Sequence, residues 1–263
     1  MIHGGVARIL GAGCRGLVYV FLALPSALVV CASVSQTEYL TFPPKGFTLV
    51  WYQRAFESKP FMDSLLLSTK LALAATSIAM IIGTFASYAV DRHRFRGRTI
   101  FLAAVLSPLL VPGIVFAIAL LQAMVLIGIG QTFWTLLVAH VVIVVPYVVR
   151  IMTAALATYD RSFEEAAMNL RAGPVRTAVQ VTLPILIPAL MSSAVFAFVM
   201  SFGNVAVSAF LAGVRDTTLP LQIFAHVQFS YDPILAAVST VIIGITVGLL
   251  VFVGRMVGVE RLL

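Results

Sequence analysis

Residues 99–149 read TIFLAAVLSPLLVPGIVFAIALLQAMVLIGIGQTFWTLLVAHVVIVVPYVV and contain no Asp, Glu, Lys or Arg. One bilayer crossing needs about 20 apolar residues, so this run must cross, turn at Gly128-Ile129-Gly130-Gln131 and cross again. The whole chain has the same character, because 61% of its 263 residues are hydrophobic and only 10% are charged. A typical globular protein has roughly 25% charged residues. The sequence therefore predicts a polytopic membrane protein and excludes an ordinary soluble domain.

Six membrane spans result when the uncharged runs are divided at turn signals. We expect an all-α protein, because a helix satisfies its own backbone hydrogen bonds in lipid and no strand-like alternation is present. Residues 1–263 are interpreted as a single transmembrane domain. Its predicted spans are about 17–34, 64–90, 99–127, 133–149, 185–211 and 234–254, and residues 150–184 form a cytoplasmic segment.

Basic residues are divided unequally between the two sets of segments that connect these spans. Cytoplasmic connections carry an excess of Lys and Arg, so the richer set predicts that both termini are cytoplasmic. A cleaved signal peptide ending near Ser33 is the alternative reading of the first span. The richer set is Arg8, Arg15, Arg92, Arg94, Arg96, Arg98, Arg150, Arg161, Arg171, Arg176, Arg255 and Arg261, and the other is Lys45, Arg54, Lys59 and Arg215.

Motifs for catalysis, for nucleotide binding and for metal binding are absent from the sequence. It contains no GxxxxGK[ST], HExxH, CxxC or GxSxG pattern, and its four histidines are scattered. We expect no enzyme activity, no metal and no cofactor in this chain, and the net charge of +7 fits membrane orientation better than nucleic-acid binding. Lys70 within the second span either snorkels or is functional. His140 is either functional or bonded to a neighbouring helix.

The longest connection contains residues 159–174, YDRSFEEAAMNLRAGP. Ser162 followed three positions later by Glu165 predicts a capping box and hence the start of a helix. Gly173-Pro174 predicts its end after about three turns. Exposed alanines at 166 and 167 allow close backbone approach. The helix is therefore suited to a groove on another protein, or it lies on the membrane surface.

This segment resembles the EAA signature of bacterial ABC importer permeases. Glu165-Ala166-Ala167 is followed at the expected interval by Val181-Thr182-Leu183-Pro184, although Arg171 replaces the signature glycine and Gly173 lies two residues later. Other stretches resemble the spermidine/putrescine-type branch of that family. They are Ser107–Gly113, Phe210–Gly213 with Thr218-Leu219-Pro220, and Pro43–Tyr52, so the resemblance covers about residues 40–255.

The resemblance implies a type I importer permease fold in the bacterial inner membrane. The EAA helix would be the coupling helix that docks on a cytoplasmic ATPase, with Glu165 as helix cap, ATPase contact or both. The implied partners are two ATP-binding cassette ATPase subunits that carry ATP and Mg, a second, non-identical permease, an external solute-binding protein and the lipid bilayer. The implied coupling residues are Glu165, Ala166, Ala167, Leu170, Arg171 and Gly173, with Leu183 and Pro184 ending the motif.

Polar residues of the fifth span are candidates for the translocation path. Ser201, Asn204 and Ser208 recur at helical spacing, so they either line a pore or form hydrogen bonds between helices; Gln122 is a further candidate. Polyamine permeases usually carry an acidic pair where this chain has Gly203-Asn204. No Asp or Glu lies inside any predicted span, so the expected solute is either polyamine-like or amino-phosphonate/opine-like. A secondary transporter or channel independent of an ATPase is the alternative class.

Overall fold

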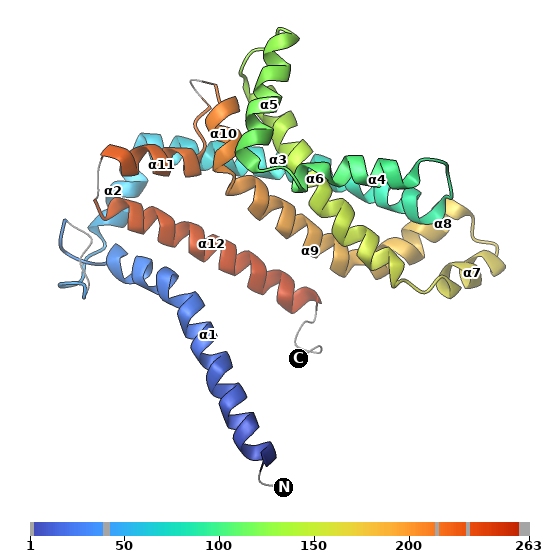
Figure 1. Cartoon of the computed structure of the whole chain (residues 1–263), viewed down its shortest axis with the longest axis horizontal. Coiled ribbons are helices and arrows are strands. Elements are labelled where there is room, and N and C mark those ends of the chain that lie inside the picture. Colours follow the sequence, from blue (N-terminus) through green and yellow to red (C-terminus); the bar gives the residue numbers. More distant parts are fainter. Residues whose placement is uncertain (1–2, 39–42, 214–215, 230–231, 258–263) are drawn as a thin grey trace. The chain divides into compact units, whose positions relative to one another are not determined.

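The computed structural model describes residues 3–38, 43–213, 216–229 and 232–257, and all regular structure within them is helical (Figure 1). Arg215 and Arg261 of the charge count lie outside these residues. The α-helices are α1 (His3–Ser33), α2 (Val50–Glu57), α3 (Lys59–Arg92), α4 (Arg98–Leu106), α5 (Gly113–Leu126), α6 (Phe133–Ala157), α7 (Ser162–Asn169), α8 (Pro174–Thr177), α9 (Leu183–Phe202), α10 (Val205–Leu211), α11 (Leu219–Phe229) and α12 (Ile234–Val257). One 3-10 turn, η1 (Ser107–Leu109), and one π-helical turn, η2 (Ala178–Thr182), complete the set.

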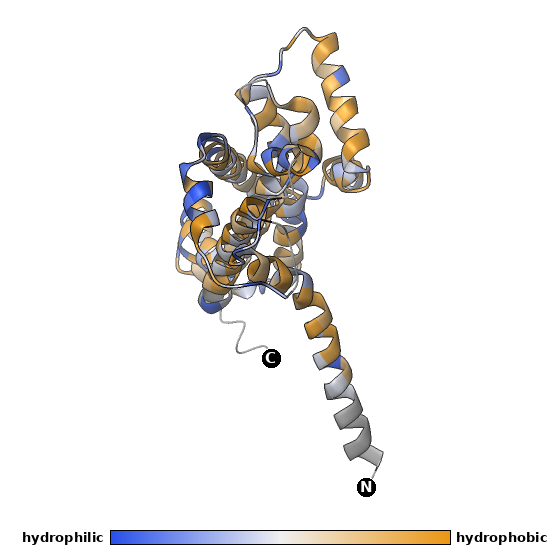
Figure 2. Ribbon diagram, turned by 90° about the vertical axis from the view of Figure 1, so that its left-hand side faces the viewer, coloured by the Kyte–Doolittle hydropathy of each residue, from blue (hydrophilic) through white to orange (hydrophobic). Residues whose placement is uncertain are grey.

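Five helical stretches are long and apolar enough to cross a bilayer. They are Gly13–Ser33, Lys59–Arg92, Phe133–Ala157, Pro174–Phe202 and Ile234–Arg255, and a bent pair formed by α4 with η1 and by α5 makes a sixth if it counts as one span. In Figure 2 most helical turns have the hydrophobic colour, and hydrophilic residues gather in a few short stretches. The expected all-α membrane fold is therefore confirmed.

The third predicted span, 99–127, is not one continuous helix. The axis of Arg98–Leu109 and that of Gly113–Leu126 differ by 107°. Pro108 lies in the 3-10 turn, and Pro112 has an extended ψ of 131° where α5 begins. Because proline lacks an amide hydrogen and its ring restricts the preceding residue, each of these two prolines removes a hydrogen bond from the helical ladder and favours a break there.

The fifth predicted span, 185–211, is also interrupted. Helix α9 ends at Phe202, and the Asn204 side chain accepts a hydrogen bond from the backbone N–H of Val207 at 2.8 Å, which starts α10. Asparagine is a favoured N-cap residue, so this side chain ends one helix register and begins another. Ser201 and Ser208 therefore do not share one continuous helix.

Several helices extend beyond the predicted span ends, and further short helices were not predicted. Helix α6 continues past residue 149 to Ala157, so the connection between it and the next spanning helix is shorter than 150–184. Helix α1 begins well before residue 17. The unpredicted helices include α2, α8 and α11, which are each too short to span a bilayer.

One compact unit of the chain comprises Met1–Met62 and Ile223–Val247. Within it the end of α1 is fixed to α2 by hydrogen bonds. The indole N–H of Trp51 donates to the carbonyl of Ser35 at 2.8 Å, and the hydroxyls of Ser33 and Tyr52 lie 2.7 Å apart. The buried Phe61 ring packs against the ring of His226 at a centroid distance of 5.4 Å.

The other compact unit comprises Asp63–Gln222 and Gly248–Leu263 and contains all of the predicted site residues. Helix α6 lies at its centre and packs against α4, α9 and α10 (Figure 1). A Cβ atom added to Gly83 of α3 would lie 2.6 Å from Val148 Cγ1 of α6, so the two helices approach closely at this glycine. Small residues permit such approach between membrane helices.

Candidate functional site: a docking helix and its anchor

Helix α7 begins at Ser162, but the predicted capping box is wrong. Arg161 is the N-cap position and contributes no side-chain cap, whereas the Asp160 carboxylate accepts a hydrogen bond from the backbone N–H of Ser162 at 2.9 Å. This bond holds the pKa of the exposed Asp160 carboxyl below its usual value. Because Asp160 takes the capping role two residues earlier than expected, Glu165 is left exposed and free of that role.

Helix α7 is also shorter than predicted, and Gly173-Pro174 does not end it. The last helical residue is Asn169, and Arg171 has a φ of +64°. The backbone N–H of Ala172 donates to the carbonyl of Ala167, and that of Arg171 to the carbonyl of Met168. This pair of bonds defines a Schellman motif, in which glycine is normally the left-handed residue. Arg171 therefore occupies the signature glycine position in the backbone conformation that favours glycine.

One face of α7 is exposed and largely apolar. Phe163, Ala166 and Leu170 follow one another at three- and four-residue spacing, with Phe163 52% exposed and Leu170 85% exposed. Ala167 is half-buried, and Glu165 and Arg171 are exposed. We call Phe163, Ala166 and Leu170 the docking face. Nothing among the described residues covers it.

The opposite face of α7 carries a buried carboxylate that the sequence did not indicate. Glu164 is 9% exposed, and its Oε1 accepts hydrogen bonds from Arg92 Nη2 and from Thr182 Oγ1, each at 2.5 Å. Asp91 lies 3.2 Å from Arg92 Nη1 and 3.0 Å from Arg161 Nη2. We call Asp91, Arg92, Arg161, Glu164 and Thr182 the anchor cluster. Losing one partner of a buried ion pair costs about 3–5 kcal/mol, so this cluster holds α7 firmly.

The motif end lies inside the spanning stretch Pro174–Phe202, where α9 follows the π turn. Helices α8, η2 and α9 follow without a gap, and Leu183 and Pro184 are the exposed first residues of α9. Because Pro184 has no amide hydrogen, the carbonyl of Gln180 loses its usual helical donor inside the π turn. Single π turns are frequent at functional sites.

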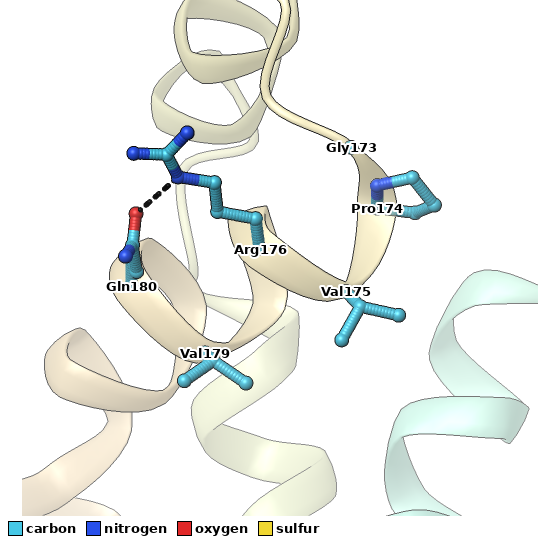
Figure 3. Close-up of a pocket in the computed structure, with 6 residues that line it drawn as sticks. All are labelled: Gly173, Pro174, Val175, Arg176, Val179 and Gln180. Atoms are coloured by element: carbon cyan, nitrogen blue, oxygen red, sulfur yellow. Dashed lines mark hydrogen bonds between the residues drawn. The ribbon is translucent and has the colours of Figure 1, made fainter.

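A shallow hollow of about 520 Å³ lies beside this turn (Figure 3). Arg176 Nε donates to Gln180 Oε1 at 2.8 Å on one side of the turn, and Val175 and Val179 project on the other. Gly173 and Pro174 complete its lining. The predicted coupling residue Gly173 therefore lies at the rim of an exposed, mostly apolar surface that follows α7 in the sequence.

Two of the predicted path residues are buried in a polar group around His140. His140 Nδ1 lies 2.9 Å from Ser201 Oγ, and His140 Nε2 lies 3.4 Å from Ser208 Oγ. All three side chains are at most 2% exposed. The contacts join α6 to α9 and α10, whereas Asn204 is half-buried and caps α10. The pore role of these residues stays a prediction.

The remaining polar candidates are exposed. Gln122 lies on α5 and Lys70 on α3, each with its side chain accessible. Within the described part of the chain, no group of three or more His, Cys, Asp or Glu side chains is arranged to hold a metal ion. The candidate site is a pair of surfaces on α7, one exposed and one anchored.

Replacing Arg171 by glycine should stabilise the end of α7. A side chain in the left-handed conformation costs about 1–2 kcal/mol, so Arg171→Gly should slow hydrogen exchange of the Ala172 amide roughly 5- to 30-fold. Arg171→Ala is the matched control, because it removes the long side chain and keeps the Cβ. If the alanine variant slowed exchange as much as the glycine variant, backbone strain would not be the cause.

Comparison with known proteins places these features in a family. Residues 79–257 match the model for the binding-protein-dependent transport system inner membrane component. The chain is 33% identical to the spermidine/putrescine transport system permease protein PotC of Haemophilus influenzae, covering 89% of this chain and 91% of that protein. It is 32% identical to the putrescine transport system permease protein PotI of Escherichia coli K12, covering 89% and 85%.

A solved structure shares the fold. It is the crystal structure of a bacterial ABC transporter involved in the import of the acidic polysaccharide alginate, and one of its chains aligns with a TM-score of 0.69 at 17% identity over 94% of both chains. At this identity the likeness concerns the fold alone. The family match, the two relatives and the helical architecture agree, and the chain belongs to the binding-protein-dependent transport family of ABC importer inner-membrane permeases.

Proposed function

We propose that this chain is one of two non-identical permease subunits that move a small solute through the inner membrane by alternating access. Two ATP-binding cassette ATPase subunits would dock on the cytoplasmic side and hydrolyse ATP, and an external binding protein would deliver the solute. The docking face on α7 carries this proposal, since Phe163 and Leu170 are apolar side chains that a partner would remove from water. The chain itself would need no cofactor.

The charge distribution supports a cytoplasmic position for both termini. Helix α7 lies in the connection that belongs to the Arg-rich set, and an ATPase that uses cellular ATP must reach it from the cytoplasm. Six crossings return the chain to its starting side. This count requires that the bent pair of α4 with η1 and α5 act as one span.

A polar, exposed position on α5 supports a path for the solute along that helix. Gln122 is accessible in the isolated chain, whereas Ser201 and Ser208 are buried against His140. Polar groups in a membrane helix are stabilised when they face protein or water. We therefore propose that Gln122 lines the path. Ser201, Ser208 and His140 would instead join the helices α6, α9 and α10 by hydrogen bonds.

Ala166→Asp should abolish docking of the ATPase. The variant places a charge in the centre of the docking face, which would have to be desolvated, and it does not touch the anchor cluster. ATPase subunits co-purified with the permease from membranes should fall by about tenfold or more, with unchanged insertion of the permease. Ala166→Ser, which is small and uncharged, is the control and should bind normally. Equal amounts of ATPase co-purified with wild type, Ala166→Asp and Ala166→Ser would refute docking at this face.

A polyamine is the solute class we propose, by extension from the names of the two relatives. Excess unlabelled putrescine should then suppress the uptake of labelled putrescine by reconstituted transporter at least tenfold, as simple mass action requires, and excess 2-aminoethylphosphonate should not.

An amino-phosphonate or opine-like solute is the second candidate, because Gly203-Asn204 replaces an acidic pair and Asn204 is already engaged as a helix cap. A dication in a low-dielectric path gains most from carboxylates, which no predicted span provides. Suppression by 2-aminoethylphosphonate but not by putrescine would contradict the polyamine proposal and favour this one.

A further inference from the structure

The anchor cluster joins three parts of the chain that are distant in sequence. Arg92 is the last residue of α3, Glu164 lies in α7, and Thr182 is the last residue of η2, directly before α9. Glu164 Oε1 is the common acceptor for Arg92 Nη2 and Thr182 Oγ1. A single carboxylate on α7 is therefore bonded both to the last residue of α3 and to the residue directly before α9.

The surroundings of Arg92 restrict the movement of the Arg92 and Glu164 side chains. The side chains of Arg92 and Glu164 are each 12% exposed, so water screens their attraction weakly. The Arg92 guanidinium carbon lies 5.3 Å from the ring centroid of Tyr88 and 5.6 Å from that of Tyr159. Aromatic rings at such distances attract a cation and occupy the space into which the side chain would otherwise rotate.

A second link runs outside the buried pair. Arg161, which precedes α7, donates from Nη2 to the backbone carbonyl of Asp91 at 3.2 Å and to its carboxylate at 3.0 Å. Asp91 directly precedes Arg92 in the sequence, and Arg161 lies three residues before Glu164. The start of α7 thus has two attachments to the end of α3, and a rotation of α7 about either one would strain the other.

We propose that Glu164, Arg92 and Thr182 are positioning residues that transmit movement of the docked ATPase to α3 and α9 together. The proposal rests on the proposed function, in which the ATPase binds the opposite face of α7. When the ATPase moves the docking face, α7 and therefore Glu164 would move with it. The hydrogen bonds of Glu164 to Arg92 and Thr182 would then displace α3 and α9. The π turn that contains Thr182 is a place where the helix backbone can yield.

The test measures ATP hydrolysis and solute uptake on the same liposomes containing the complete transporter, for wild type, Glu164→Gln, Arg92→Gln and the double variant. The probe is labelled putrescine, or 2-aminoethylphosphonate if the competition experiment selects it. Solute carried per ATP should fall about fivefold or more in each single variant while hydrolysis persists. The double variant should be no worse than either single variant, because the two residues act as one unit.

Arg94→Gln is the matched control for Arg92→Gln. Arg94 is exposed two residues away, loses the same charge, and makes no ion pair or hydrogen bond within the described residues. Its ratio of solute to ATP should equal that of wild type. Thr182→Val removes one hydroxyl without leaving a buried charge unpaired, and it carries the test if the charge variants do not fold. The amount of solute carried per ATP by Thr182→Val should fall about twofold or more.

Two outcomes would overturn the proposal. An unchanged ratio in the folded variants would show that the cluster transmits nothing. A loss of uptake in proportion to lost ATPase assembly would show that it only stabilises the fold. Failure of the proposed function looks different, because then the wild-type preparation itself would contain no ATPase or would take up solute without ATP.

Discussion

The buried pair between Arg92 and Glu164 fixes where α7 lies relative to the membrane-spanning helices of its unit. Without it, α7 is a helix of two turns between a capping carboxylate and a left-handed residue, and so short a helix is unstable alone in water. The pair removes that instability by attaching one face of α7 to the end of α3. The other face is then held in a constant orientation, which a docking surface requires.

Close contacts also fix the spanning helices of this unit to one another. Gly83 lets α3 approach Val148 of α6, and the polar group around His140 joins α6 to α9 and α10. Polar contacts of this kind between membrane helices contribute about 1 kcal/mol each, so their main effect is to select which faces meet. Breaks at proline and asparagine let the chain change direction between α4 and α5 and begin a new helix after α9.

Hydropathy and charge were sufficient to predict an all-helical membrane protein, because the bilayer leaves few ways to satisfy a backbone. The same signals could not show the 107° bend at Pro108 and Pro112, since those prolines are also tolerated in continuous membrane helices. The sequence also did not show that Asn204 is the N-cap of α10. A polar residue in an apolar run gives the same pattern whether it caps a helix or lines a pore.

Some of the site residues could be predicted from local sequence, and others could not. The EAA resemblance located α7 and its exposed alanine, whereas the positive φ of Arg171 at the signature glycine position became known only from the structure. Asp160 and Ser162 both have side chains able to cap a helix, so local sequence alone did not decide between them. Glu164 and Arg92 are separated by 72 positions, and only the fold brings them together. A usable signal existed in Asp91-Arg92, a charge pair directly at the end of a long apolar span.

The most direct test of this account places a photoreactive amino acid at Leu170 on the docking face and, in a separate variant, at the exposed Leu22 of α1. After illumination of membranes that contain the whole transporter, the attached partners are identified by mass spectrometry. The account predicts that position 170 attaches to the ATP-binding cassette subunit and that position 22 does not. Attachment of position 170 to lipid alone would contradict it, because α7 would then be an interfacial helix rather than a docking element.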